Sequence, residues 1–259
     1  MSKVIALTRS VSPAMADCEL THMSRVPIDV ALAAKQHAAY ERALETLGCS
    51  VHRLPSTTDI PDAVFIEDMA VALDEIAVIM RPGAASRRHE IAEVAEWLKH
   101  RMLLARIEAP GTMDGGDVLV VGRQMFVGAT SRTNAEGHEQ LRRIVEYFGY
   151  TINVVEVRGC LHLKSAVTAI SDDVLLVNRG WVPDSAFKDF ELVDVHPSEP
   201  SAANVVHVGS RLLYSAAFPW TLERLRERNL QVTTVDVGEL AKAEGAVTCC
   251  SVIMNTPEN

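Results

Sequence analysis

Cys249 and His162 lie far apart in the sequence, but their side chains together could carry out covalent catalysis. Cys249 lies in the apolar segment AVTCCSVIM and His162 in GCLHLKSAV. A single cysteine or histidine in such a segment is usually a structural residue. Paired in space, a thiolate is a nucleophile, and an imidazole with a pKa of about 6.5 is an acid and base at neutral pH. The two residues therefore predict a thiol active site if the fold brings them together.

Asp114 could orient the histidine. It lies in TMDGGDVLV, where Gly115 and Gly116 permit backbone conformations that a Cβ atom disfavours. One interpretation is an ordinary Asp-Gly turn. The other is a carboxylate that hydrogen-bonds to His162, fixes its tautomer and supports the imidazolium. Asp117 either braces the turn or shares that role.

Glu67 and Asp68 are consecutive acids inside the apolar, strand-like segment PDAVFIEDMAVAL. Burying two carboxylates is costly unless they are paired. A bound cation is the simplest compensation, and a planar guanidinium suits carboxylates because they can grip it with two hydrogen bonds. Asp62 precedes the same segment and is either a turn residue or a partner for an ammonium group.

Arg87 in GAASRRHE and Arg132 in GATSRTNAEG directly precede predicted helices. A single exposed arginine is usually only a solvated surface residue. Because these two occupy matching positions in successive parts of the chain, we expect them to clamp a carboxylate together.

The elements that must position these residues recur along the chain. Apolar patterning predicts hairpins over 64–81, 117–130, 166–178 and 204–216, helices over 28–47, 87–100 (with Ser86 as a cap), 133–148 and 219–229, and single strands over 3–9, 50–54, 151–157 and 231–237. One polar or catalytic residue marks the head of each repeat, and these landmarks lie 46, 48, 42 and 45 residues apart: Asp68, Asp114, His162, Asn204 and Cys249. The sequence thus predicts repeats of hairpin, helix and strand.

The last hairpin has only its first arm, residues 247–254, and its natural partner is the strand over 3–9. Pairing them would close a ring between the two ends of the chain and leave no edge strand exposed. A WD-type propeller has a similar period, but each unit here is predicted to contain a helix of 11 to 20 residues. We therefore predict an α/β fold, a five-bladed α/β propeller of ββαβ units, as one domain over residues 1–259. The landmarks would converge on its axis.

Composition excludes several classes of function. The net charge of −9 disfavours nucleic acid as a partner. The five cysteines include no Cys-x-x-Cys pair, so a zinc ribbon is poorly supported. The N-terminus lacks a signal peptide, and no apolar run is long enough to span a bilayer. We expect a cytoplasmic protein with free thiols and no membrane partner. The oligomeric state stays open, with a homodimer as one assembly.

The chain resembles the dimethylarginine dimethylaminohydrolase family over essentially its whole length. The motifs that carry this resemblance, in order, are LTHMSRVPID, PDAVFIED, RPGAASRR, IEAPGTMDGGDVL, SRTNAEG, LHLKSAV, SAAN and TCCS. The resemblance implies the five-bladed α/β propeller of guanidine-modifying enzymes. It also implies hydrolysis of asymmetric dimethylarginine or monomethylarginine to citrulline and dimethylamine or methylamine, without a cofactor.

The resemblance also implies residue roles. Cys249 would be the nucleophile, His162 the acid and base, and Asp114 the residue that orients the histidine. Substrate would be bound at the guanidinium by Asp68 with Glu67, at the α-ammonium by Asp62 and the carbonyl of Leu20, and at the α-carboxylate by Arg87 and Arg132. The carbonyl of Ala243, six residues before Cys249, would also contact the ligand. Bacterial members often have Glu-Ala-Gly-Asp where this chain has Asp114-Gly-Gly-Asp117, and either acid can orient a histidine.

Lys164 separates this chain from arginine and agmatine deiminases, which carry an aspartate two residues after the histidine. Without that carboxylate, methyl groups on the departing nitrogen have room. The runner-up is nevertheless a deiminase-like enzyme or a hydrolase of another substituted guanidine. A third class is a non-catalytic sensor of cationic amino acids.

For the mechanism, we expect the bound cation to promote ionisation of Cys249. No metal is expected for catalysis, although Zn²⁺ at Cys249 and His162 would inhibit. Residues 12–27 are a candidate lid that holds Leu20.

Overall fold

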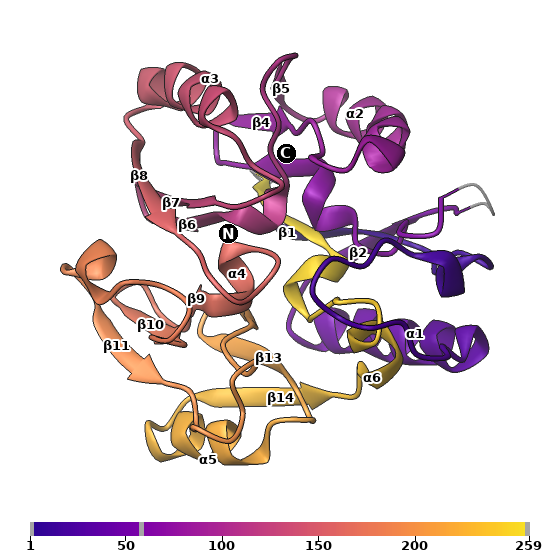
Figure 1. Cartoon of the computed structure of the whole chain (residues 1–259), viewed down its shortest axis with the longest axis vertical. Coiled ribbons are helices and arrows are strands. Elements are labelled where there is room, and N and C mark those ends of the chain that lie inside the picture. The colour runs from indigo at the N-terminus through magenta and orange to yellow at the C-terminus, as the bar shows by residue number, and fades with distance from the viewer. Residues whose placement is uncertain (1–2, 57–59, 257–259) are drawn as a thin grey trace.

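Five three-stranded sheets surround a central axis like the blades of a propeller (Figure 1). The computed structural model describes residues 3–56 and 60–256. In every sheet the middle strand runs antiparallel to the inner strand and parallel to the outer strand. This repeated arrangement confirms the predicted five-bladed α/β fold.

The strands fall into three sets according to their distance from the axis. The inner strands are β3 (Ala70–Ala72), β6 (Val118–Val121), β9 (Val167–Ala169), β12 (Val205–Val208) and β15 (Val252–Thr256). The middle strands are β1 (Lys3–Arg9), β4 (Ile76–Ile79), β7 (Gln124–Ala129), β10 (Val174–Val177) and β13 (Arg211–Ser215). The outer strands are β2 (Ser50–Leu54), β5 (Leu103–Arg106), β8 (Thr151–Glu156), β11 (Glu191–Asp194) and β14 (Gln231–Val235).

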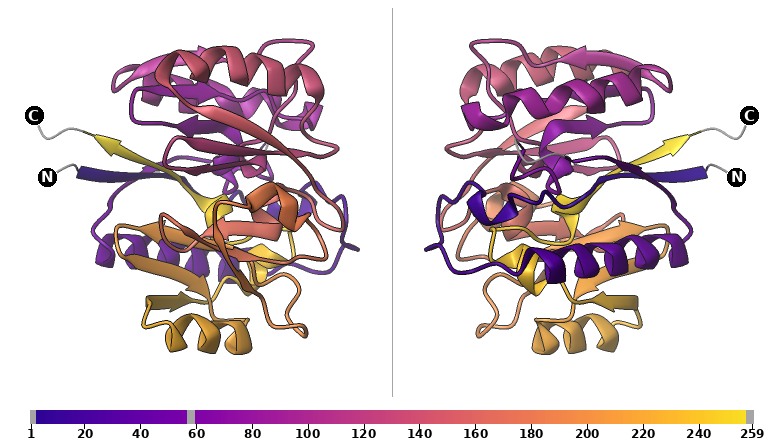
Figure 2. Two further views of the ribbon diagram at one scale, coloured as in Figure 1. Left: turned by 90° about the vertical axis from the view of Figure 1, so that its left-hand side faces the viewer. Right: turned by 90° about the vertical axis from the view of Figure 1, so that its right-hand side faces the viewer.

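The fifth blade joins the two ends of the chain. Strand β15 pairs with β1 from Lys3 opposite Thr256 to Leu7 opposite Val252, and β2 completes the sheet. The ends of these two strands accordingly lie side by side (Figure 2). The expected closure of the ring by the terminal strands is confirmed. The expectation that no edge strand remains is not, because β15 and β2 are the two edge strands of this sheet and β15 packs beside β3 of the first blade.

The four longer helices pack against the outer parts of the blades: α1 (Val30–Thr46), α2 (Ile91–Lys99), α3 (Ala135–Val145) and α5 (Pro219–Glu227). The short helix α4 (Leu163–Ala166) lies near the axis at the head of β9, and α6 (Gly238–Ala241) contacts α1. Apolar clusters fill the spaces between neighbouring blades. One cluster joins Leu7 of β1, Ile79 of β4 and Leu98 of α2, all of which are fully buried. Burial of each such side chain contributes about 1.5–3 kcal/mol, so packing between blades holds the ring together.

Two helix predictions are wrong. The third blade has no long helix: the segment 178–190 between β10 and β11 contains only a 3-10 turn over Asp184–Phe187. Ser86 does not cap a helix over 87–100; a 3-10 segment over Ala85–Glu90 leads into α2, and the Ser86 hydroxyl donates to Glu19 instead (2.5 Å).

The head of each inner strand is a tight turn, which the strand patterning did not predict. Glu67 and Asp68 lie on the 3-10 turn η2 (Ile66–Met69), and Cys249 lies on η7 (Thr248–Cys250), so their expected placement in strands is wrong. Three residues complete one turn of a 3-10 helix, so neighbouring side chains diverge by about 120° rather than facing opposite sides. The turns therefore direct functional groups toward the axis while the strands below remain apolar.

Candidate active site

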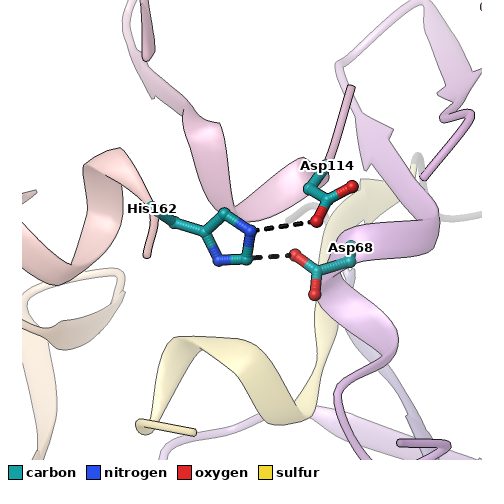
Figure 3. Close-up of side chains that lie close together, drawn as sticks. All are labelled: Asp68, Asp114 and His162. Atoms are coloured by element: carbon teal, nitrogen blue, oxygen red, sulfur yellow. Dashed lines mark hydrogen bonds and ion pairs between the residues drawn. The ribbon is translucent and has the colours of Figure 1, made fainter. Parts of the chain in front are cut away.

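His162 lies between two carboxylates at the axis (Figure 3). Its Nε2 is 3.0 Å from Asp114 Oδ2, and its Nδ1 is 3.9 Å from Asp68 Oδ1. Burial alone would lower the pKa of His162, but the charge of Asp68 and the hydrogen bond to Asp114 outweigh burial and raise it to about 9. The ring is therefore an imidazolium at neutral pH, which is an acid ready to donate a proton.

Neighbouring groups approach Gly115 and Gly116 so closely that neither position has room for a Cβ atom. A Cβ on Gly116 would lie 2.6 Å from His162 Nδ1 and 2.9 Å from Asp68 Oδ1, and the Gly116 amide donates to that carboxylate (3.0 Å). A Cβ on Gly115 would lie 2.0 Å from the carbonyl oxygen of Glu67. The Asp-Gly-Gly sequence thus allows the second blade to approach the first blade and the histidine.

We predict that Gly116→Ala lowers kcat by about 10²-fold, because a displacement of about 1 Å between reacting groups costs that much. Circular dichroism should show a folded variant, and citrulline formation would measure the loss. Gly122→Ala is a control at another glycine, since no atom lies within 4 Å of its Cβ position, although its φ of +56° adds some strain. Equal turnover by Gly116→Ala and wild type would contradict the tight fit.

Cys249 lines the same cavity as His162. Its Sγ accepts a hydrogen bond from the Ala246 amide at 3.3 Å. Burial, reinforced by the negative charges of Glu67 and Asp68, raises the pKa of the Cys249 thiol to about 12. The resting site therefore combines a neutral thiol with a charged imidazolium, and a further cation is needed to make the thiolate accessible.

The two adjacent acids have cationic partners from the chain itself. Glu67 binds Lys164 Nζ (2.6 Å), and Asp68 binds Arg87 Nη1 (2.6 Å). Burial opposes ionisation of Asp68, but the charges of His162 and Arg87 outweigh it and lower its pKa. A bound ligand is therefore not needed to compensate these acids, contrary to the expectation from the sequence.

Glu67 also faces a different space from Asp68. Asp68 lines the cavity that contains Cys249, whereas Glu67 and Lys164 line a channel of about 260 Å³ between the inner strands. The 3-10 turn explains this divergence of neighbouring side chains.

The other predicted binding residues surround the same cavity, with one exception. Asp62, Arg87, Arg132 and Ala243 line it, but Leu20 does not; Leu20 packs on a neighbouring apolar cluster, and Glu19 lines the cavity in its place. Burial raises the pKa of the Asp62 carboxyl to about 6 despite the charge of Arg87. An ammonium group beside Asp62 would favour its ionised form.

The guanidinium groups of Arg87 and Arg132 differ in how many hydrogen bonds they already make within the protein. The Arg87 guanidinium binds Asp68, both carboxylate oxygens of Glu90 (3.0 and 3.1 Å) and the Phe65 carbonyl oxygen (3.0 Å). Arg132 Nη2 donates to the Thr21 hydroxyl at 2.9 Å. Arg132 Nη1 also lies 3.6 Å from Asp114 Oδ2, so an anion that replaced the Thr21 hydroxyl would bind an arginine already paired with one carboxylate. Arg87 has more partners and is held firmly in the wall.

Residues 19–23 cover the cavity through polar contacts. The Glu19 amide donates to Asp62 (3.1 Å), and the amides of Thr21, His22 and Met23 all donate to the Glu244 carboxylate. The cavity beneath has a volume of about 20 Å³, enough for about one water molecule.

Sequence reasoning missed three groups at the site. Glu244 adopts φ +59°, a backbone conformation that nothing in the sequence indicates for this residue. Thr248 donates through its hydroxyl to Glu67 (2.9 Å), and Asn204 binds Thr248, although Asn204 stood out only as a landmark of the repeat. Asp117, whose role stayed open, braces its turn: it accepts from Thr130, Thr133 and the Leu163 amide.

Within the described ranges, one group of side chains could hold a metal ion: Asp68, Asp114 and His162. Their atoms lie within 4.8 Å of one another. This set differs from the expected zinc pair, because two carboxylates rather than the Cys249 thiol accompany the histidine.

Five three-stranded blades around a cavity lined by a thiol, an imidazole and carboxylates are the arrangement of a guanidine-modifying enzyme with the pentein fold. A family model described as "N,N dimethylarginine dimethylhydrolase, eukaryotic" matches residues 23–254. The chain belongs to the dimethylarginine dimethylaminohydrolase family, whose members are hydrolases of C–N bonds. Among the described residues, no helix is long and apolar enough to cross a membrane.

Individual relatives agree with this assignment. The dimethylarginine dimethylaminohydrolase of Streptomyces coelicolor is 42% identical over 252 residues, which cover 95% of each chain. The Pseudomonas aeruginosa enzyme, solved as a cysteine-to-serine mutant with citrulline, has a TM-score of 0.92 at 34% identity, covering 98% of this chain and 99% of that one. A dimethylarginine dimethylaminohydrolase with histidine replaced by glycine was solved as an adduct with S-methyl-L-thiocitrulline. It also has a TM-score of 0.92 at 34% identity, and the match covers 98% of this chain and 100% of that one.

Proposed function

We propose that this protein hydrolyses asymmetric dimethylarginine and monomethylarginine to L-citrulline and dimethylamine or methylamine. The observation that carries the proposal is the cavity shared by Cys249, His162 and Asp68. It combines a nucleophile, a protonated acid and a carboxylate for a cationic substrate. The family relatives named for this activity, and those solved with citrulline or its thio analogue, support the same substrate class.

The substrate would span the cavity from Asp68 to Asp62. Asp68 would bind the guanidinium beside Cys249, and Asp62 would bind the α-ammonium, with the carbonyls of Ala243 and Leu20 as further acceptors. Arg132, assisted by Arg87, would bind the α-carboxylate after Thr21 leaves it. Glu67 would have to leave Lys164 before it could bind the guanidinium directly. We therefore assign Glu67 a long-range electrostatic effect on the substrate rather than a direct contact.

In the first half of the reaction the thiol of Cys249 releases its proton to solvent, because the substrate cation beside it favours the thiolate and His162 is already protonated. The thiolate attacks the guanidinium carbon and forms a C–S bond. His162 then donates its proton to the methylated nitrogen as the C–N bond breaks, so that the amine leaves neutral. The product is a covalent S-alkylthiouronium on Cys249.

In the second half His162, now neutral, removes a proton from a water molecule that attacks the same carbon. The C–S bond breaks as the carbonyl of citrulline forms, the hydroxyl proton of the adduct passes to the Cys249 sulfur, and neutral citrulline leaves. Asp114 holds the ring orientation throughout through the Nε2 hydrogen bond. The residues themselves supply every group needed, so we propose that catalysis requires no cofactor and that Zn²⁺ bound at Cys249 and His162 would only inhibit.

Methylated substrates fit because Lys164 occupies the position where deiminases carry a second carboxylate. Its pairing with Glu67 at 2.6 Å directs both groups toward the central channel. Among the described residues that line the cavity, Asp68 is thus the carboxylate that lies beside both Cys249 and His162, with its Oδ1 3.9 Å from His162 Nδ1. We further propose that residues 1–259 act as one catalytic domain in the cytoplasm, that residues 12–27 open as a lid, and that a homodimer is compatible with activity.

The raised pKa of Cys249 predicts how the free enzyme reacts with a neutral alkylating reagent. The thiolate is the reactive form, so its fraction should rise about tenfold per pH unit well below a pKa of about 12. We expect the rate of alkylation by iodoacetamide to rise about 100-fold from pH 7 to pH 9. The Cys249→Ser variant supplies the background from the other cysteines. A rate that is constant over this range would instead indicate a permanent thiolate–imidazolium pair.

Citrulline and amine release from four substrates tests the function: arginine, monomethylarginine, and asymmetric and symmetric dimethylarginine. The proposal requires dimethylamine from asymmetric dimethylarginine. Ammonia from free arginine as the main product would favour the deiminase. Alkylation of Cys249 without turnover on any of the four would favour the sensor of cationic amino acids.

A further inference from the structure

Asn204 is the one landmark of the repeat that the mechanism does not use. Asn204 is 3% exposed, and it directly precedes β12 (Val205–Val208). Its Nδ2 donates to the Lys164 carbonyl oxygen (2.9 Å) and to the Thr248 hydroxyl (3.0 Å), and its Oδ1 accepts from the Thr248 amide (3.0 Å). Both amide hydrogens and the carbonyl oxygen are thus engaged.

These three hydrogen bonds join the two turns that carry the reacting groups. Thr248 immediately precedes Cys249 on η7, and Lys164 lies two residues after His162, which caps α4. Asn204 belongs to the fourth blade and lies between the third blade, which supplies the histidine, and the fifth, which supplies the cysteine. A single buried amide therefore connects the nucleophile turn with the acid–base turn.

A closed set of contacts strengthens this connection. Thr248 donates its hydroxyl to Glu67, and Glu67 binds the Lys164 ammonium. Glu67, Lys164, Asn204 and Thr248 thus form a ring of interactions directly behind the reacting side chains. Because buried polar networks of this kind have few alternative arrangements, the ring favours one relative placement of the two turns.

We propose that Asn204 is a positioning residue that sets the separation between the Cys249 thiol and the His162 ring. The proposal rests on the proposed function, because it assigns to this separation the transfer of a proton from His162 to the departing amine. Asn204 does not line the cavity that holds Cys249 and His162, although it lines a neighbouring pocket of about 380 Å³ that shares Leu161 with that cavity. Its direct partners are Thr248 and Lys164, so we assign its effect to these two residues. Loss of its amide should lower kcat and leave KM within about threefold.

The first experiment compares Asn204→Ala with Thr168→Val. Thr168 is 2% exposed, and its hydroxyl binds the Ala203 carbonyl oxygen (2.7 Å) and the Val205 amide (3.1 Å), on either side of Asn204. The control thus removes buried hydrogen bonds from the same neighbourhood without touching either turn. We expect kcat on dimethylarginine to fall about 10²-fold in Asn204→Ala and less than about threefold in Thr168→Val.

The second experiment repeats Asn204→Ala in a His162→Gly background. The readout is the rate of adduct formation with S-methyl-L-thiocitrulline, whose thiolate leaving group needs no proton from histidine. If Asn204 acts by placing His162 relative to Cys249, its removal should cost less than about threefold here, because interacting residues are not additive. A general loss of structure would cost the same in both backgrounds.

The outcomes separate this proposal from the proposed function. No dimethylamine from the wild-type enzyme would contradict the function itself. Wild-type turnover with equal kcat values for Asn204→Ala and Thr168→Val would overturn the role of Asn204, as would an equal loss in the two histidine backgrounds. A KM effect of Asn204→Ala larger than its kcat effect would also overturn it.

Discussion

Cys249→Ser is expected to reduce citrulline formation by about 10⁴-fold or more, because a serine hydroxyl cannot replace a thiolate nucleophile here. Substrate binding should persist, since the acids and arginines around the cavity are unchanged. The measurement is kcat for dimethylarginine together with the binding constant from calorimetry. Mass spectrometry of the quenched reaction should detect a covalent intermediate in the wild type and none in the variant.

Cys250→Ser provides the matched control for this substitution. Cys250 is fully buried beside Cys249, and its thiol donates to the Ala246 carbonyl oxygen (3.6 Å), an interaction that a serine hydroxyl can retain. We expect turnover within about threefold of the wild type. If Cys249→Ser kept wild-type turnover, or Cys250→Ser lost it while Cys249→Ser did not, the assignment of the nucleophile would be wrong.

His162→Gly is expected to lower kcat on dimethylarginine by about 10³-fold, within the range that general acid–base catalysis supplies. The loss has two physical causes: no imidazolium remains to protonate the amine, and no imidazole remains to activate water. S-methyl-L-thiocitrulline separates these causes. Its leaving group, methanethiolate, can depart without a proton from histidine, so the covalent adduct still forms, but water is not activated to hydrolyse that adduct. Intact-protein mass spectrometry should therefore show a stable adduct on Cys249.

His138→Gln is a suitable control for the loss of a buried histidine. His138 is 8% exposed against 6% for His162, and its Nε2 lies 3.0 Å from the Gly128 carbonyl oxygen, where a glutamine amide can also donate. Turnover should stay within about threefold of the wild type. Undiminished dimethylarginine hydrolysis by His162→Gly would rule out the histidine as the proton donor.

The period of the landmarks predicted the ring and its closure by the terminal strands. This succeeded because each repeat has to bury its own apolar strands against its neighbours, which leaves a regular trace in the sequence. The third blade broke the rule for helices, since the connection from β10 to β11 contains only the 3-10 turn over Asp184–Phe187. The repeat therefore fixed the strands of every blade but not the helix of each one.

The sequence also indicated most residues of the cavity. Cys249, His162, Asp68, Asp62 and Arg132 were expected to meet, and they line one space. Leu20 and Glu67 did not line it. The direction of a side chain on a tight turn depends on backbone angles that residue spacing does not specify.

The sequence by itself determined the α/β class, the five-fold repeat, the thiol and imidazole that can react, and the family resemblance. Only the tertiary structure decided which charges face one another: Asp68 with Arg87 and His162, and Glu67 with Lys164. The charge of Asp68 and the hydrogen bond to Asp114 raise the pKa of His162 to about 9 against the effect of burial, and burial with the charges of Glu67 and Asp68 raises the pKa of Cys249 to about 12. The physical reason is that electrostatic energies depend on distances and burial, which arise only when segments from different blades meet at the axis.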